Sequence, residues 1–253
     1  MLSTVRKTEL AKALEGIDGW FGLAEAKQLS EAVSAFPPLR EPLTIVEIGS
    51  WKGRSTIALA LGLADRAGTV FAIDPHDTTA VDLVSEYGVA DTFAEFEANL
   101  ARAGVSSKVR TMRKTSTEAI DELPRSIDVL FVDGSHRYED VRADLSRYLP
   151  RLAPRSVVAF NDPTLPGVYR ALRESVLRGR RDFYDGMVVQ NTLFLSRDVS
   201  RTRSFADVVQ FARLRLLLLL RYLGVKYRDL PPRRFMRSGQ RFARWIGGGA
   251  ALG

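Results

Sequence analysis

Four short segments of this chain carry carboxylate, amide and imidazole side chains directly after runs of apolar residues. The segments are EIGSWKG at 47–53, DPHD at 74–77, DGSH at 133–136 and NDP at 161–163. Short apolar runs of this kind are typical of buried strands, and ligands of open α/β sheets bind beyond the carboxyl ends of the strands. We therefore expect the four segments to meet at one edge of a sheet and to form a single polar site.

The first segment predicts a tight loop between a strand and a helix. Gly49 and Gly53 flank this loop, and glycine permits positive φ angles and a close approach of the backbone to a ligand. The spacing E-x-G-x-x-x-G differs from the G-x-G-x-x-G of dinucleotide-binding proteins, and Glu47 suits a ligand ammonium better than a pyrophosphate. Asp74 can accept hydrogen bonds from ribose hydroxyls. A ligand with an amino-acid end and a ribose end, such as S-adenosylmethionine (SAM), would suit this crevice.

The two later segments indicate metal and proton chemistry. Asp133, Asn161 and Asp162 offer two carboxylates and an amide oxygen at neighbouring strand ends, and such hard ligands suit Mg²⁺. His136 follows Asp133 by three residues and could remove a proton from a hydroxyl held at that metal, because imidazole titrates near neutral pH. Two other interpretations stay open. An aspartate at a strand end is often a helix cap or a turn residue, and Asp133 could merely border the ligand pocket.

The elements that must position these side chains alternate along the chain. Strands are predicted at 43–48, 69–73, 109–112, 127–132 and 156–160, followed by an antiparallel pair at 183–189 and 191–195. Helices are predicted at 8–15, 23–35, 55–63, 90–103, 138–148 and 167–177. Continuously apolar strands that alternate with helices form a parallel sheet covered on both faces. The predicted fold class is a doubly wound, mostly parallel α/β sheet of seven strands.

Length and composition favour one α/β domain with small additions. The chain has 253 residues, of which 45% are hydrophobic, enough for one good-sized core. We expect an N-terminal helical cap at 1–40, a ligand-binding domain at 41–196 and a basic helical tail at 197–253 whose end is disordered. The chain has no cysteine, which excludes disulfides, thiol catalysis and cysteine metal sites. The N-terminus lacks the apolar segment of a signal peptide, and we expect a cytoplasmic protein.

The positive charge of the chain is concentrated in the tail. The net charge is +7, but residues 196–253 alone carry 13 basic and three acidic residues, which leaves a net charge of −3 for residues 1–195. A mildly acidic body argues against a specific nucleic-acid partner. The apolar run at 216–220 is too short to span a bilayer. The tail could lie on a membrane surface as a basic amphipathic helix, or it could pack on the body or on a second subunit of a homo-oligomer.

Three segments carry a resemblance to a known family: VEIGSWKGRST, FAIDPHD and IDVLFVDGSHRYEDVRADLSRYLPRLAPRSVVAFNDP. They resemble the class I SAM-dependent methyltransferases, and the likeness extends over residues 16–195. More narrowly, they resemble the subgroup in which the fourth strand ends in D-G-S-H. This subgroup includes metal-dependent O-methyltransferases of sugars, such as those of macrolide deoxysugars and mycobacterial methylmannose polysaccharides. The resemblance implies a Rossmann-like sheet, SAM as the cofactor and Mg²⁺ as a second ligand.

The resemblance also implies roles for individual residues. His136 would be the general base, Asp133 would be a second catalytic residue, and His76 would lie near the adenosine or form a wall of the site. Asn161 departs from the pattern, because several relatives carry a carboxylate there, although catechol-type relatives use an Asp/Asn pair. The implied metal ligands are Asp133, Asn161 and Asp162. The implied SAM-binding residues are Glu47, Gly49, Ser50, Gly53, Ser55, Thr56, Asp74, Pro75, Thr115, Ser116 and Asp133.

We therefore expect an enzyme that transfers a methyl group from SAM to a hydroxyl of a sugar, a glycan or another polyhydroxylated acceptor. Two alternatives remain. The same site could methylate a catechol or a similar small phenol. The chain could instead be a catalytically silent SAM-binding partner protein. Replacement of His136 separates this last alternative from an enzyme, because only an enzyme would lose turnover while it keeps SAM affinity.

Overall fold

The computed structural model describes residues 4–37, 41–77, 91–178 and 182–224. The strands are β1 (Leu43–Ile48), β2 (Gly68–Ile73), β3 (Val109–Met112), β4 (Ile127–Val132), β5 (Leu152–Asn161), β6 (Phe183–Val189) and β7 (Thr192–Asp198). The helices are α1 (Thr4–Ala13), α2 (Leu23–Ser34), α3 (Arg54–Leu63), α5 (Phe93–Arg102), α6 (Ser116–Ala119), α7 (Tyr138–Tyr148), α8 (Pro166–Leu172) and α9 (Phe205–Tyr222). Short 3₁₀ turns lie at 106–108, 120–122 and 149–151.

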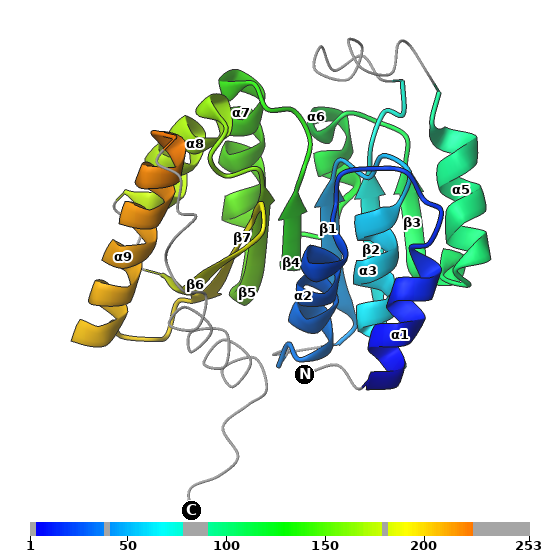
Figure 1. The fold of residues 1–253 in the computed structure, drawn as a ribbon, viewed down its shortest axis with the longest axis horizontal. Helices are drawn as coiled ribbons and strands as arrows, with labels where there is room; N and C mark the ends of the chain where they lie inside the picture. The colour runs from blue at the N-terminus through cyan, green and yellow to red at the C-terminus, as the bar shows by residue number, and fades with distance from the viewer. Residues whose placement is uncertain (1–3, 38–40, 78–90, 179–181, 225–253) are drawn as a thin grey trace, which may run out of the picture.

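The strands form one seven-stranded sheet in the order β3-β2-β1-β4-β5-β7-β6 (Figure 1). The first five strands of the chain pair in parallel, and β7 pairs antiparallel with both β5 and β6. This arrangement confirms the predicted fold class. From β1 the chain proceeds to β2 and β3 on one side, whereas β4 and β5 lie on the other. The strand order therefore reverses between β1 and β4, which is where open α/β sheets bind ligands.

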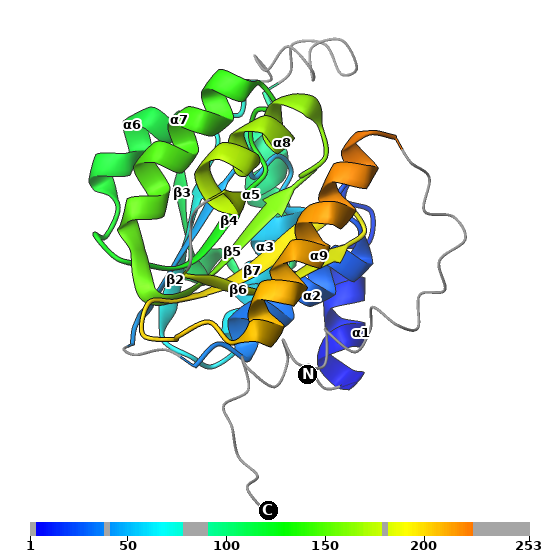
Figure 2. The same cartoon turned by 90° about the vertical axis from the view of Figure 1, so that its left-hand side faces the viewer.

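Alternating side chains of each strand enter two separate cores, because successive residues of a strand point to opposite faces. In β1, Val46 and Ile48 pack with the apolar faces of α6, α7, α8 and α9. Leu43 and Ile45 pack on the other face with α1, α2, α3 and α5. Figures 1 and 2 show the resulting three layers. The N-terminal helices α1 and α2 thus share one continuous core with α3.

Several boundaries differ from the sequence-based expectation. β5 begins at Leu152 rather than at 156, and its pairing with β4 shifts register between Ile127 and Val129. This irregularity accommodates Pro154, which has no N–H to donate to a neighbouring strand. The helix predicted at 167–177 is α8 followed by one π-helical segment, Arg173–Leu177.

Parts of the prediction fall outside the described residues. The end of the basic tail that is expected to be disordered lies there, within residues 225–253. The tail helix is present as α9 and ends at Tyr222. None of the helices in the described ranges is long and apolar enough to cross a membrane.

Candidate functional site

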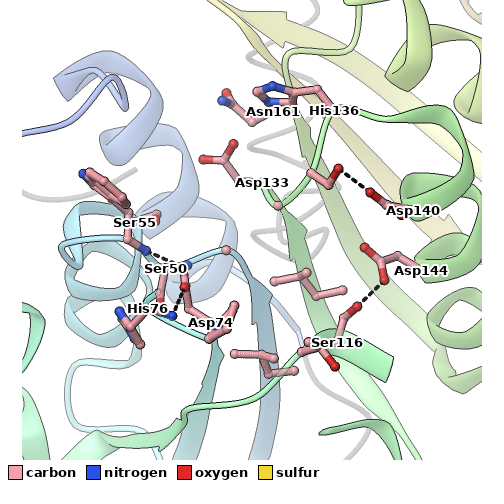
Figure 3. Close-up of a pocket in the computed structure, with 18 of the residues that line it drawn as sticks. Ser50, Ser55, Asp74, His76, Ser116, Asp133, His136, Asp140, Asp144 and Asn161 are labelled. Carbon is pink, nitrogen blue, oxygen red and sulfur yellow. Dashed lines mark hydrogen bonds between the residues drawn. The ribbon is translucent and has the colours of Figure 1, made fainter. Parts of the chain in front are cut away.

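A cavity of about 740 Å³ opens at the carboxyl ends of the parallel strands (Figure 3). Its walls come from the loops that follow β1, β2, β3, β4 and β5, from residues of α3, α6 and α7, and from residues 19–21. Most predicted site residues line it: Gly49, Ser50, Ser55, Asp74, Pro75, Thr115, Ser116, Asp133, His136, Asn161 and Asp162. Tertiary structure therefore brings the four polar segments together as the sequence predicts. Three predicted residues, Glu47, Gly53 and Thr56, do not line the cavity.

Glu47 lies behind the first loop rather than on the cavity wall. It shares a face of β1 with Leu43 and Ile45, so its side chain points toward α3 and is fully buried. The hydroxyl of Thr56 donates to Glu47 Oε2 at 2.5 Å. Burial raises the pKa of Glu47 to about 7. Its Oε1 atom has no hydrogen-bond partner among the described residues. Glu47 thus holds the first turn of α3 in place, and a direct contact with SAM stays a prediction.

The two loop glycines are required by the packing of the protein itself. Gly49 has φ +86°, and a Cβ atom there would collide with the carbonyl oxygen of Asp133. Gly53 has φ +94°, and a Cβ atom would lie 3.2 Å from the ring of Phe96. Absence of a side chain at Gly49 lets the β1 loop lie directly against the β4 loop. Glycine here sets the distance between two walls of the cavity.

Asp74 fixes the loop between β1 and α3. Its Oδ2 atom accepts hydrogen bonds from the backbone N–H groups of Ser50 and Trp51, both at 2.9 Å. Its Oδ1 atom accepts one from the N–H of His76 at 2.7 Å. Figure 3 shows the carboxylate between the two loops. A carboxylate can accept about four hydrogen bonds, so Asp74 retains capacity for a ligand hydroxyl.

His76 forms a wall of the cavity, as the sequence predicts. The ring is buried, lies 4.8 Å from the ring of Phe96, and places Nδ1 3.0 Å from Thr92 Oγ1. Burial lowers the pKa of His76 below its ordinary value. The imidazole is therefore neutral at pH 7, and its role is to shape the cavity next to Asp74.

The predicted catalytic and metal-binding residues meet at the other end of the cavity (Figure 3). His136 Nε2 lies 3.7 Å from Asp162 Oδ2. Asn161 Nδ2 lies 3.4 Å from the same oxygen, and the Asn161 side chain also donates to Asp133. Burial, followed by neighbouring carboxylates, raises the pKa of Asp133 well above its ordinary range, and burial also raises that of Asp162. Two carboxylates thus share one end of the cavity with one imidazole.

The amide of Asn161 is turned away from the role of a metal ligand. Its Oδ1 atom lies 2.9 Å from the hydroxyl of Thr192, which also lies 2.8 Å from Glu25 Oε1. Its NH₂ group faces the carboxylates of Asp133 and Asp162. Two of the three predicted ligands therefore present oxygen to the cavity. Within the described ranges, no group of three or more His, Cys, Asp or Glu side chains is arranged to hold a metal ion.

A tryptophan pair at the cavity was not assigned from the sequence. Trp20 and Trp51 both line it, with ring centroids 5.8 Å apart. Arg54 holds the loop that carries Trp20, because its guanidinium donates to the carbonyl oxygens of Phe21 at 2.8 Å and Leu14 at 3.2 Å. Sequence reasoning did not reveal this role of Arg54. Its partners lie more than 30 positions away in the chain, so no local pattern could reveal them.

Asp144 is a second cavity residue that sequence reasoning missed. Its Oδ1 atom accepts a hydrogen bond from Ser116 Oγ at 2.5 Å, and burial raises the pKa of Asp144 to about 6. Figure 3 shows this pair on the wall across from Asp74. Helical periodicity contains the relevant signal, since Asp144 shares the buried face of α7 with Val141 and Tyr148. A carboxylate on such a face needs a partner or a ligand.

Comparisons with known proteins agree with this geometry. Residues 46–163 match the sequence family described as methyltransferase domain. An uncharacterised protein of Sinorhizobium fredii is 37% identical over 124 residues, which are 48% of this chain and 13% of that protein. An uncharacterised protein of Acanthamoeba polyphaga mimivirus is 28% identical over 130 residues, 49% of this chain and 52% of that one. This chain thus spans about an eighth and about half of the lengths of these two relatives.

Solved structures of O-methyltransferases share the fold. NovP has a TM-score of 0.59 at 17% identity, covering 70% of this chain and 81% of its own. TomG from Streptomyces achromogenes, solved with SAM, has a TM-score of 0.54 at 18% identity, covering 78% and 91%. A Bacillus cereus O-methyltransferase, solved with S-adenosylhomocysteine (SAH), has a TM-score of 0.52 at 14% identity. The match covers 78% of this chain and 92% of that one. Residues 46–163 are therefore similar to a methyltransferase domain, and the sheet that contains them has the fold of these O-methyltransferases.

Proposed function

We propose that this protein is an O-methyltransferase that moves the methyl group of SAM to a hydroxyl of a sugar, a glycan or another polyhydroxylated acceptor. One observation carries the proposal. A single cavity has the Asp74 loop on one wall and the group of Asp133, His136, Asn161 and Asp162 at its other end. The cofactor and the acceptor can therefore both bind in this cavity, with their reacting atoms next to each other.

The cofactor end of the cavity fits SAM in three respects. Asp74 retains capacity to accept a hydrogen bond from a ribose hydroxyl. The N-terminal turn of α3 begins directly after the loop that Asp74 holds, and helix N-termini favour an anionic group such as a carboxylate. Ser116 and Asp144 offer polar atoms on the wall across from Asp74, where the edge of an adenine could be recognised. SAM would place its sulfonium between these groups and His136.

His136 would act on the acceptor. Its imidazole takes the proton of the acceptor hydroxyl, while the oxygen attacks the methyl carbon of SAM in line with the carbon–sulfur bond. The methyl carbon gains a bond to oxygen, the electron pair of its former bond stays on sulfur, and SAH leaves. Asp162, 3.7 Å from His136 Nε2, would stabilise the imidazolium that forms.

The donor set fits a divalent cation in part. Asp133 and Asp162 supply hard carboxylate oxygens, and burial raises the pKa of both, so a bound cation would offset the cost of holding them ionised. Asn161 would contribute only if its amide oxygen replaced its NH₂ group on the cavity side. When bound, Mg²⁺ supplies positive charge that lowers the pKa of an acceptor hydroxyl. His136 and Asp162 do their part in proton removal with or without it.

The pair of Trp20 and Trp51 could contact the acceptor. Aromatic faces contact the apolar faces of sugar rings, and they also stack on phenols. Trp20 is 53% exposed, so the pair can meet an acceptor that enters from solvent. This observation keeps a catechol-type acceptor as the second candidate. An acceptor screen with both saccharides and catechols separates the two.

The first experiment is a calorimetric titration of the full chain with SAH, with and without Mg²⁺, followed by transfer of labelled methyl from SAM to the acceptor panel. We expect saturable SAH binding and methyl transfer to a hydroxyl compound. His136→Asn should keep SAH affinity and lose about 10²–10⁴-fold in kcat. Arg137→Gln, an exposed neighbour at the same cavity, is the control. Absence of SAH binding would refute the proposal, and SAH binding without transfer to any acceptor would favour the silent binding protein.

A further inference from the structure

Helix α9 is firmly docked on the body through one apolar stripe. Phe211, Leu214 and Leu218 are buried against the core that includes β7 and α8. Leu214 packs directly on Gly186 of β6, where a Cβ atom would collide with it. The ring of Tyr222 stacks on Tyr169 of α8 at 4.4 Å. Figure 2 shows α9 running along the outside of the molecule.

A second apolar stripe runs along the solvent side of the same helix. Its exposed fractions are 85% at Phe205, 50% at Val208, 54% at Leu216, 38% at Leu219 and 62% at Leu223. With Ala212, these positions fall within a sector about 80° wide, since each residue turns an α-helix by about 100°. We call this set the outer stripe. A surface helix normally has one apolar face, and the outer stripe is a second one, left open by the residues that the structure describes.

The outer stripe is flanked by arginines, and the sequence after α9 is basic. Arg213 and Arg215 are exposed on its two sides. The sequence that follows α9, residues 225–253, contains seven basic residues and one acidic residue, Asp229. Exposed apolar side chains beside a concentration of arginines are typical of segments that bind anionic lipid, in which the apolar groups enter the acyl boundary and the cations contact the phosphates.

We propose that the outer stripe of α9, together with the exposed arginines on its two sides, docks the protein on an anionic lipid surface. The helix lies parallel to the surface over a length of about 27 Å, at 1.5 Å per residue. The charge and the apolar character of this surface distinguish a lipid surface from the other possible binding partners. A second copy of this chain would bring two tails of net charge +10 together, which like-charge repulsion opposes. A nucleic acid would satisfy the arginines but leave Phe205, Leu216 and Leu223 in water.

Vesicle sedimentation of the full-length protein tests the proposal. We expect binding to vesicles of phosphatidylcholine mixed with phosphatidylglycerol, weaker binding at higher salt, and little binding to phosphatidylcholine alone. Leu216→Asp should reduce the binding at least about tenfold, because it places a charge in the stripe. Ala206→Asp is the matched control, since Ala206 is exposed on α9 outside the stripe and the change in charge is the same. Leu216 is exposed, so thermal unfolding should be unchanged in both variants.

Three outcomes would overturn the proposal. Equal loss of binding in both variants would mean that charge alone, and not the stripe, makes the contact. Dimerisation that Leu216→Asp abolishes, without vesicle binding, would assign the stripe to a second copy. Binding of RNA or DNA oligonucleotides that is insensitive to Leu216→Asp, without vesicle binding, would assign the tail to nucleic acid. SAH titration of the same variants shows separately whether the cavity is intact.

Discussion

At the level of single residues, the acidic side chains of the site divide into those that hold the protein and those that face the cavity. Glu47 accepts a hydrogen bond from the Thr56 hydroxyl, and Asp74 accepts three backbone hydrogen bonds while it lines the cavity. Asp133 and Asp162 face the cavity near one imidazole. Acidic residues that look equivalent along the sequence therefore make different contributions to stability and to ligand binding.

Asp74→Asn should weaken SAH binding by more than about tenfold. An amide cannot accept on both of its terminal atoms, so the substitution loses at least one charge-assisted hydrogen bond to the loop, each worth roughly 1.5–3 kcal/mol, and alters the ribose contact that we propose. Calorimetry against Asp65→Asn, an exposed aspartate beyond α3, measures the effect. Equal SAH affinity in the two variants would remove Asp74 from the cofactor site.

Glu47 should make stability depend on pH. Its pKa is about 7 in the folded chain and roughly 4.3 in the unfolded one. Between these values the folded state binds more protons than the unfolded state, so the free energy of unfolding falls as pH rises from roughly 4.5 to 7. Glu47→Gln keeps an acceptor for the Thr56 hydroxyl and removes this dependence of the free energy of unfolding on pH. Urea unfolding should show that the free energy of unfolding of the variant exceeds that of the natural protein by up to about 3 kcal/mol at pH 8. No such difference would contradict a carboxylate whose pKa is raised by burial.

At the level of elements, the loop between β1 and α3 is positioned by contacts with three other elements. Gly49 packs against the loop after β4, Asp74 holds it from the end of β2, and Phe96 of α5 lies against Gly53. The loop is therefore a rigid wall whose position depends on the whole edge of the sheet. Small changes at its contacts should move two cavity walls at once.

Gly49→Ala should destabilise the protein by about 2 kcal/mol or more and weaken SAH binding, because the methyl group collides with the Asp133 carbonyl and the backbone has φ +86°. Gly104→Ala is the control, since Gly104 has φ +68° but nothing within 4 Å of the added carbon. It should cost only the backbone strain of about 1 kcal/mol. Urea unfolding distinguishes the two, and equal costs would show that close packing at Gly49 is unimportant.

At the level of the whole molecule, the N-terminal helices are connected to the site at the strand ends. Glu25 of α2 accepts hydrogen bonds from Asn191 N–H at 3.0 Å and Thr192 at 2.8 Å, and Thr192 lies beside Asn161. Arg54 of α3 holds residues 14–21 from the other side. Residues before β1 therefore complete the cavity rather than form a separate cover.

Arg54→Met should loosen the N-terminal segment and leave the sheet intact. Loss of the hydrogen bonds to Leu14 and Phe21 should increase hydrogen exchange at residues 14–21 by about tenfold or more. An acceptor that contacts Trp20 should then show a higher KM with a smaller change in SAH affinity. Arg137→Met, at the same cavity but 63% exposed at its side chain, is the control. Unchanged hydrogen exchange at residues 14–21 would contradict the role of Arg54 in holding this segment.

Much of the architecture could be predicted from the sequence because its signals are local. Apolar strands, helical periodicity and polar residues at strand ends identified the parallel sheet and the edge where Asp74, Asp133 and His136 meet. Boundaries were less accurate where a local rule conflicts with tertiary pairing, as at Pro154 within β5. The pleat of β1 directs Glu47 toward α3 and Thr56, an orientation that no local pattern reveals, and its contact with SAM stays a prediction.

The sequence by itself determined the fold class, the edge of the sheet that carries the chemistry, and most of the residues found there. Only the tertiary structure decided which polar atoms are already engaged. It showed that the Asn161 oxygen faces Thr192, that Arg54 holds a loop 40 positions from its own site, and that α9 has a second apolar face. Periodicity and strand ends are properties of neighbouring residues, whereas these contacts join residues up to 167 positions apart, as in the pair of Glu25 and Thr192, and exist only once the chain has folded.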